Sequence, residues 1–313
     1  MTRYAIRRLL VAIPTLLAAY TLVFLFIRVA PGDPAVAALG DYASAEAVQA
    51  LRERMGLNAP LWVQYVRTLV GYLRGDLGHS LITNIPISTQ IASALPHTLE
   101  LTFAGVLIGS LLGIPLGVVA AVHRNRFADY MSRVLSLAGI SIPAFYLGIL
   151  LILAFAVQLR WFPVMGAGDF SEPVKNLRHL ALPALSLGII MTAFVARMTR
   201  SCFLNVLRED YVRTARAKGL CERAVLLIHS LRNALIPVVA VLGTQAALLI
   251  GDSVMTEVVF SRPGMGKLIV QAMLQRDYIA LQSLIVVYGA FVVLINLITD
   301  LSYGLIDPRI RYD

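Results

Sequence analysis

The sequence predicts an all-α integral membrane protein that crosses the bilayer six times. Of its 313 residues, 58% are hydrophobic and 14% are charged, and the mean hydropathy is +0.76. Six segments of 17 to 26 residues contain no Asp, Glu, Lys, Arg or His. A hydrocarbon core about 30 Å thick requires roughly 20 residues of α-helix, so each segment can span it. The predicted spans are residues 9–27, 101–122, 134–159, 180–196, 233–251 and 279–299.

Lys and Arg are distributed unevenly over the connecting segments, which predicts the orientation of the chain. With the N-terminus inside, the inward segments hold 16 Lys and Arg against 7 acidic residues, and the outward segments hold 11 of each kind. Because basic residues accumulate on the cytoplasmic side, both termini are predicted to be cytoplasmic. This bias accounts for the net charge of +9, so no nucleic-acid partner is expected. The inward segments are 1–8, 123–133, 197–232 and 300–313, and the outward segments are 28–100, 160–179 and 252–278.

The outward segment 28–100 is too long for a simple turn. Its sequence predicts a small helical region, with amphipathic helices at 43–55 and 61–74. Gly56 and Pro60 separate the two helices, as residues that end helices do. A cap over the ends of the spans and a platform for a soluble partner are both consistent with this pattern.

Cysteine, histidine and glycine spacing argues against disulfide, metal and nucleotide sites in this chain. Cys202 and Cys221 both fall in the predicted cytoplasmic segment 197–232, where thiols stay reduced, and the five His residues have no ligand-like spacing. The string SRPGMGKL has Ser261 where a phosphate-binding loop requires Gly, and Leu268 where it requires Ser or Thr. We therefore expect no metal, no cofactor bound by this chain, and no enzymatic activity of its own.

The second predicted span carries a stripe of small residues. Gly105, Gly109, Gly113 and Gly117 recur every four residues and therefore lie on one face of a helix. Small residues allow helix backbones to approach closely in a membrane. Tight packing inside one subunit and a face that slides during transport both remain open, and packing is the favoured interpretation.

Charged side chains are missing from the predicted spans, which bears on the mechanism of transport. An ion-coupled carrier usually places Asp, Glu or His near the middle of the membrane, so energy input from the cytoplasmic side is the better hypothesis. An ion-coupled secondary transporter and a membrane-embedded enzyme remain as alternatives of other classes. The polar residues that continue the fifth span outward are candidates for lining a pathway: Gln245, Asp252, Ser253 and Glu257.

The inward segment 197–232 is much longer than a connection between two spans requires. Its 36 residues suffice for two short helices, with Gly219 as a natural end to the first helix. Ala215 and Ala217 are small, which suits insertion into a groove of another protein. Arg213, Arg216 and Lys218 would lie near the acidic or polar rim of that groove, and Tyr211 would anchor its entry.

Spacing within this segment resembles a known family. Arg213, Thr214 and Ala215, then three residues, then Gly219, correspond to the EAA signature of permease subunits in binding-protein-dependent ATP-binding-cassette (ABC) importers. This chain departs from the signature in having Arg213 in place of Glu and Arg232 in place of Pro. The strings similar to the dipeptide, oligopeptide, glutathione and nickel branch are PGDP at 31–34, GISIPAF at 139–145, EDYVRTARAKGL at 209–220, HSLRNALIPVV at 229–239, RPGMGKL at 262–268, RDY at 276–278 and DPRIRYD at 307–313.

The resemblance implies a multi-pass permease of the bacterial inner membrane that takes up short peptides, with the shared transmembrane domain at 98–303. These residues do not distinguish a peptide substrate from glutathione, a nickel chelate or a sugar oligomer. The implied partners are a second homologous permease, two cytoplasmic ATPases that use ATP and Mg, an external substrate-binding protein and membrane lipid. The residues implied in ATPase coupling are Tyr211, Arg213, Thr214, Ala215, Arg216, Ala217, Lys218, Gly219 and Leu220.

Overall fold

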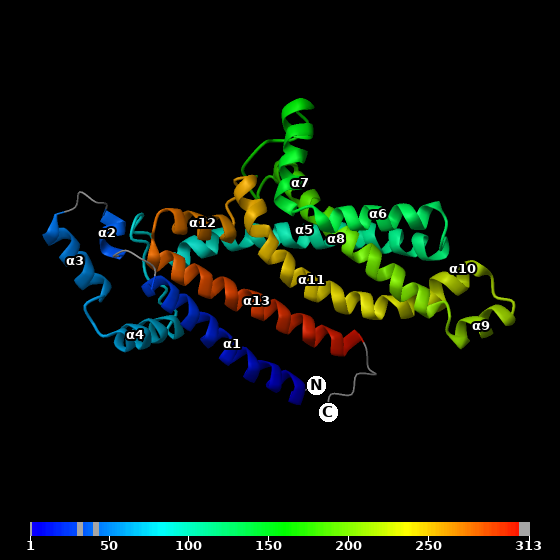
Figure 1. Ribbon diagram of the computed structural model, residues 1–313, viewed down its shortest axis with the longest axis horizontal. Helices are drawn as coiled ribbons and strands as arrows, with labels where there is room; N and C mark the ends of the chain where they lie inside the picture. Colours follow the sequence, from blue (N-terminus) through cyan, green and yellow to red (C-terminus); the bar gives the residue numbers. More distant parts are fainter. Residues whose placement is uncertain (1, 30–33, 40–43, 307–313) are drawn as a thin grey trace. The chain divides into compact units, whose positions relative to one another are not determined.

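The computed structural model describes residues 2–29, 34–39 and 44–306. The described chain is helical, apart from turns and one isolated bridge between His79 and Pro86 (Figure 1). Two sequence strings that carry the family resemblance, most of PGDP and all of DPRIRYD, lie outside the described residues. The helices are α1 (Thr2–Val29), α2 (Pro34–Leu39), α3 (Ala45–Met55), α4 (Leu61–Leu73), α5 (Ile87–Val122), α6 (Phe127–Ser141), α7 (Ala144–Leu151), α8 (Pro173–Val206), α9 (Asp210–Ala217), α10 (Glu222–Ala224), α11 (Arg232–Val259), α12 (Met265–Leu274) and α13 (Tyr278–Ile306), with π-helical turns at Ile152–Gln158 after α7 and Val225–Leu231 after α10.

Five described helices are long and apolar enough to cross a membrane. A sixth span is provided by a bent pair, α6 and α7 with its π-helical turn, whose axes differ by 100°. The predicted span 134–159 is therefore not one straight helix, and Figure 1 shows α7 turning away from α6. The break falls at Ile142, which is extended at φ −97° and ψ 123°, because Pro143 disfavours helical geometry in the residue before it.

Several helices extend beyond the predicted apolar spans. α5 begins at Ile87, well before the predicted start at 101, and α8 continues to Val206, ten residues past the predicted end at 196. The hydrogen bonds of an α-helix do not depend on apolar side chains, so hydropathy marks the depth of the bilayer and not the ends of the helix.

The chain forms two compact units. Among the described residues, unit 1 comprises 2–5, 97–262 and 295–306, and unit 2 comprises 6–29, 34–39, 44–96 and 263–294. In unit 1, α8 is the central helix and packs against α6, α7 and α11. One of its apolar clusters joins α5, α8 and α11, and consists of Leu101, Leu180, Ala184, Leu187 and Leu249.

The glycine stripe of α5 lies directly against α8. A Cβ added at Gly113 would lie 2.7 Å from Cβ of Val195, and one added at Gly117 would lie 2.6 Å from the carbonyl oxygen of Ala196. Real Cβ atoms do not approach so closely, so each glycine permits a contact that a larger residue would prevent. The stripe therefore packs inside the subunit.

Unit 2 contains the predicted helical region outside the spans, and both predicted helices are present as α3 and α4. Ser44 caps α3 by accepting a hydrogen bond from the amide of Ala47 at 3.2 Å, and Gly56 ends it with a positive φ of 67°. Tyr20 of α1 donates a hydrogen bond to the carbonyl oxygen of Tyr65 on α4 at 2.8 Å. The apolar core of this unit joins α5, α12 and α13 and consists of Ile87, Ile91, Ala94, Met265, Ala272, Ala280 and Leu284.

Asp277 organises the loop that follows α4. Its Oδ2 atom accepts hydrogen bonds from Ser80 Oγ at 2.6 Å and from the amide of Leu81 at 3.0 Å, and its Oδ1 atom accepts from the amide of Ala280 at 3.1 Å. The buried carboxylate thus caps the start of α13 and holds the loop on it. This accounts for the Asp of the RDY string.

Candidate functional site

α9 is a short helix between two longer ones, and its ends are well defined. Glu209 is extended at φ −68° and ψ 146°, and the hydroxyl of Thr214 donates to the carbonyl oxygen of Asp210 at 2.9 Å. Beyond the helix, Gly219 has φ +78°, and the amide of Leu220 reaches back to the carbonyl oxygen of Ala215 at 3.4 Å. A glycine in the left-handed region after the last helical turn reverses the chain toward α10, which begins at Glu222.

One face of α9 packs on the protein itself. Val212 and Ala215 are buried against Val225 and the partly buried Val206 and Leu207 at the end of α8. The expectation that Ala215 enters a groove of another protein is therefore wrong, because its methyl group already faces this core. Ala217, by contrast, is exposed.

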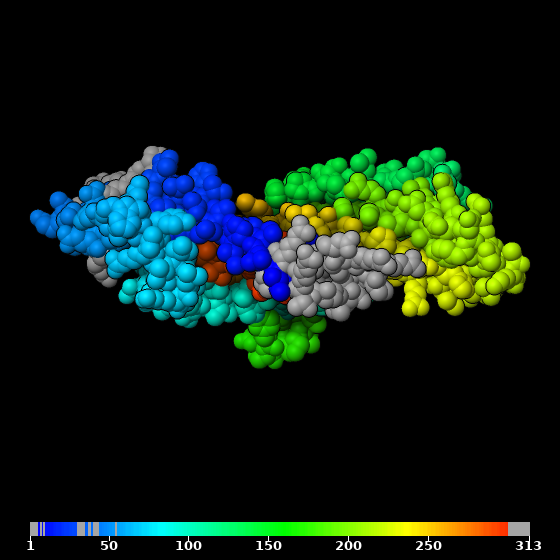
Figure 2. Space-filling model, turned by 90° about the horizontal axis from the view of Figure 1, so that it is seen from below, coloured from blue at the N-terminus to red at the C-terminus, as the bar shows by residue number. Residues whose placement is uncertain are grey.

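The opposite face of α9 is open and mixes apolar with basic side chains. Tyr211 is 42% exposed and Leu220 is 43% exposed, and Arg213, Thr214 and Lys218 are exposed beside them. In Figure 2 this segment, drawn in yellow-green, forms part of the visible surface. Exposed aromatic and apolar side chains next to arginines are typical of a protein interface.

Arg216 pairs within the chain. Its Nη2 and Nε atoms donate to the two carboxylate oxygens of Glu222 at 2.7 and 3.2 Å. This pair lowers the pKa of Glu222 and raises the pKa of Arg216. The two residues link the end of α9 to the start of α10, so Arg216 stabilises the conformation of this surface. Arg213, by contrast, makes a long contact of 3.5 Å with Asp210.

An ion pair between α6 and α8 was not expected from the sequence. Arg200 binds the buried Asp129 through two hydrogen bonds, of 2.5 Å from Nε and 2.9 Å from Nη2, and Arg133 lies 3.5 Å from the same carboxylate. The amide of Asn125 also donates to Asp129 at 2.9 Å. In the sequence, these arginines indicated only the orientation of the chain in the membrane. No local spacing links residue 129 to residue 200.

The break between α6 and α7 borders a cavity of about 350 Å³ in unit 1. Asp252, one of the predicted pathway residues, is exposed and lines this cavity. Its remaining lining comes from α6, α7, α8 and α11 and is mostly apolar: Ile140, Ile142, Pro143, Ala144, Phe145, Ile190, Gly251 and Met255.

The other predicted pathway residues lie in different surroundings. Gln245 is half-buried on α11. Ser253 and Glu257 are fully buried: Ser253 donates to the carbonyl oxygen of Ile250, and Glu257 accepts a hydrogen bond from Thr98 at 2.7 Å. The expectation that these two residues line an open pathway is wrong for this structure, because α11 turns them toward the packed interior of the subunit.

The arginine of the RPGMGKL string is also buried in unit 1. Arg262 is fully buried and binds Glu100, which also accepts a hydrogen bond from Asn176 at 2.5 Å. Burial lowers the pKa of Arg262, and the negative charge of Glu100 opposes this effect. The string thus provides a structural ion pair. Among the described residues, no group of three or more His, Cys, Asp or Glu is placed to hold a metal ion.

Solved structures with this arrangement of helices are ABC transporters. The chain is similar to a chain of the MetNI methionine ABC transporter in inward-facing conformations, with a TM-score of 0.59 and 20% identity over 71% of this chain and 98% of that chain. It is also similar to an amino acid ABC transporter solved with histidines, with a TM-score of 0.54 and 17% identity over 71% and 95% of the two chains. The fold is therefore that of an ABC transporter permease.

The chain belongs to the family of binding-protein-dependent transport system inner membrane components. The model of that family matches residues 113–312, and the model of its N-terminal region matches residues 1–102. Over the full length of both chains, the sequence is 44% identical to the glutathione transport system permease protein GsiC of Salmonella paratyphi A and 43% identical to that of Escherichia coli K12. The protein is a multi-pass permease subunit of an ABC importer in the bacterial inner membrane.

Proposed function

We propose that this subunit forms, with a second permease, the pathway through which an ATP-driven importer takes up short peptides, glutathione among them. The observation that carries the proposal is the 44% identity, over the whole of both chains, to a glutathione transport system permease protein. Substrate reaches the pathway from an external binding protein, and two cytoplasmic ATPases supply the energy. The subunit itself binds no nucleotide.

The exposed face of α9 is the proposed seat for an ATPase subunit. Tyr211 and Leu220 supply apolar contacts and Arg213 and Lys218 supply charge, while Val212 and Ala215 anchor the helix to α8 and the turn at Val225. A helix that is fixed on one face and docked on the other passes movement of the partner to the end of α8. This requires α9 to face the cytoplasm, in agreement with the bias of Lys and Arg.

The cavity beside the break in α6 and α7 is the proposed part of the pathway in this subunit. Broken spans bring backbone polar groups into a membrane only where they line a cavity or are buried in protein. The chain between α6 and α7 meets that condition, and Asp252 adds the ionisable side chain of this lining. A second permease would close the cavity on its open side.

The test is uptake by cells that express the whole importer and lack other peptide importers. We expect radiolabelled glutathione to accumulate, and the accumulation to continue in the presence of a protonophore while ATP is maintained. An excess of unlabelled dipeptide should reduce this accumulation. Loss of uptake on addition of the protonophore at constant ATP would indicate an ion-coupled carrier. Uptake of a nickel chelate or an oligosaccharide without uptake of either peptide would overturn the substrate assignment.

A further inference from the structure

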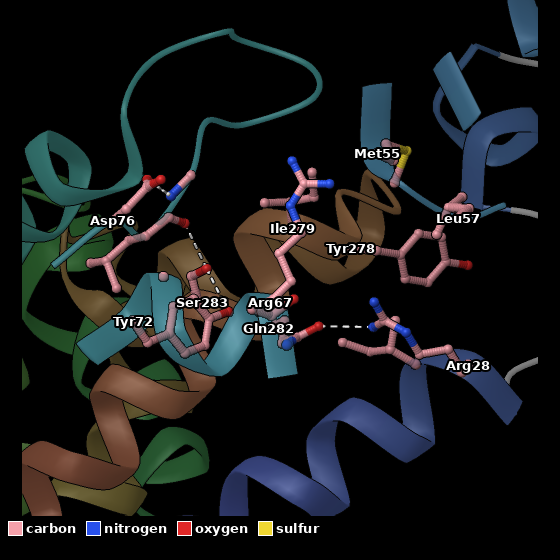
Figure 3. A pocket seen from close by; sticks show the side chains of 15 residues that line it. Arg28, Met55, Leu57, Arg67, Tyr72, Asp76, Tyr278, Ile279, Gln282 and Ser283 are labelled. Atoms are coloured by element: carbon pink, nitrogen blue, oxygen red, sulfur yellow. Dashed lines mark hydrogen bonds between the residues drawn. The ribbon is translucent and has the colours of Figure 1, made fainter. Parts of the chain in front are cut away.

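Unit 2 contains a cavity of about 260 Å³ (Figure 3). Its walls are the end of α1, Met55 at the end of α3, Leu57 two residues further on, the second half of α4, the loop after α4 and the start of α13. Sites for drug-sized molecules usually occupy about 300–1,000 Å³. This cavity is smaller and therefore suits a small ligand such as an amino acid or a dipeptide.

Two guanidinium groups lie on the lining of this cavity without a carboxylate partner. Arg28 donates to Gln282 Oε1 at 2.9 Å and to Gln64 Oε1 at 3.4 Å, and its guanidinium lies 3.9 Å from the centre of the Phe24 ring. Arg67 extends to the end of α3, where one of its nitrogens would lie 3.4 Å from a Cβ at Gly56. Among the described residues, no carboxylate lies within ion-pairing distance of either arginine.

Two buried donors on this lining also lack a hydrogen-bond acceptor within the described part of the chain. Gln282 is 4% exposed, and its Nε2 atom is unpartnered, as is the Nε atom of Arg28. Gln282 and Arg28 both line the cavity, and Figure 3 shows the hydrogen bond that holds them together. A buried donor without an acceptor is unfavourable, so an anionic group that enters the cavity gains hydrogen bonds as well as charge.

The far side of the lining carries an acceptor for a cation. Asp76 is exposed on the cavity wall, and its Oδ1 atom accepts a hydrogen bond from the amide of Gly78 at 3.0 Å. Ser283 donates to the carbonyl oxygen of Leu77 at 2.8 Å, so the hydroxyl of Tyr72 donates to Ser283 and keeps its own oxygen as an acceptor. Positive groups therefore occur together with a carboxylate and a phenol oxygen around one small space.

We propose that this cavity binds a small zwitterion of amino-acid or dipeptide size. Arg28, Arg67 and Gln282 hold its carboxylate, and Asp76 receives its ammonium group. Arginine binds carboxylates with a planar pair of donors, which favours a carboxylate over a spherical anion. A dianion such as phosphate has no positive group to pair with the carboxylate of Asp76, whereas a zwitterion has its ammonium group. The inference does not depend on the proposed substrate, because the site lies in unit 2 and the proposed pathway lies in unit 1.

The test is calorimetric binding to the full-length chain in lipid nanodiscs, with glycylglycine and glycylglycinamide as matched probes that differ in the carboxylate. We expect glycylglycine to bind about tenfold or more tightly than its amide, since a charge-assisted hydrogen-bonded pair is lost. Arg67→Gln should weaken binding of glycylglycine about tenfold. Arg74→Gln, which changes an exposed arginine outside the cavity, should leave the affinity unchanged.

A second pair of probes tests the role of Asp76. N-acetylglycylglycine lacks the ammonium group, so we expect it to bind to the wild type more weakly than glycylglycine does. In the variant Asp76→Asn, we expect the two peptides to bind with equal affinity. Equal affinity of the dipeptide and its amide, unchanged binding in Arg67→Gln, or absence of binding at millimolar concentration would overturn the proposal. Displacement by inorganic phosphate as effective as by glycylglycine would identify an unselective anion site and would also overturn it. If the importer does not take up glutathione but the cavity binds glycylglycine as expected, only the proposed function is refuted.

Discussion

The proposed coupling role depends on the backbone conformation of Gly219. Its φ of +78° is in the left-handed region, and no atom lies within 4 Å of a Cβ built there. A substitution therefore acts through backbone strain and not through a clash. The chain reversal after α9, which leaves Leu220 exposed, depends on this single conformation.

We expect Gly219→Val to reduce uptake and to weaken retention of the ATPase subunits, while the protein remains folded in the membrane. The left-handed conformation costs an L-residue about 1–2 kcal/mol, and the strain is relieved by changing the turn. Copurification of the ATPases and labelled substrate uptake are the measurements. Gly289→Ala is the control, because that glycine has an ordinary φ and open space around it. Normal uptake and normal ATPase retention in Gly219→Val would discredit the coupling role.

The charge of Asp129 is a second feature at the residue scale. Its carboxylate is buried and accepts two hydrogen bonds from Arg200. Because a buried charge without its partner is unfavourable, removal of either member of the pair should destabilise the contact between α6 and α8.

We expect Asp129→Asn to lower the free energy of unfolding by about 3 kcal/mol, because Arg200 loses its charge partner in a mostly buried position. Thermal unfolding in detergent measures the change. Asp210→Asn removes the partner of Arg213 on the exposed surface and should change stability by less than about 1 kcal/mol. Equal melting temperatures for Asp129→Asn and the wild type would show that the pair is not structural.

At the scale of elements, the contact between α5 and α8 depends on the glycine stripe. Helices gain little from the hydrophobic effect inside a bilayer, so their contact relies on close backbone approach. The spacing of four residues predicted a common face for the stripe. Which helix that face meets could not be predicted, because spacing within one helix contains no information about its neighbour.

We expect Gly113→Ala to destabilise the subunit by about 1–3 kcal/mol, since the new methyl group would overlap Val195. The matched control is Gly251→Ala on α11, where an added Cβ meets nothing within 4 Å. Unfolding in a mixed detergent with increasing denaturant compares the two variants. A stability of Gly113→Ala no lower than that of Gly251→Ala would contradict the packing role of the stripe.

At the scale of the whole molecule, the proposed function depends on the side of the membrane that α9 faces. Cys221 is exposed two residues after Gly219 and offers a probe of that orientation. In the variant Cys202→Ala, Cys221 is the one remaining cysteine of the chain. We expect a membrane-impermeant maleimide to label it in inverted vesicles and in lysed cells but not in intact spheroplasts. Labelling in intact spheroplasts would place α9 outside and refute the proposed coupling.

The sequence by itself determined the membrane class, the helices on either side of Gly56 and the end of the short helix at Gly219. Each follows from local chemistry, since apolar length, helix-ending residues and glycine act within a few residues along the chain. The family resemblance was also readable from local strings, and the full-length identity of 44% supports it.

Only the tertiary structure decided which polar side chains are buried and which face open space. Ser253 and Glu257 were predicted beside Asp252 on a pathway, yet α11 turns them inward and leaves Asp252 at the cavity. In the same way Ala215 faces the core of its own subunit, and Arg28 meets Gln282 across more than 250 residues of sequence. The physical reason is that burial and ion pairing depend on which helices pack together, and residues far apart in the chain make those contacts.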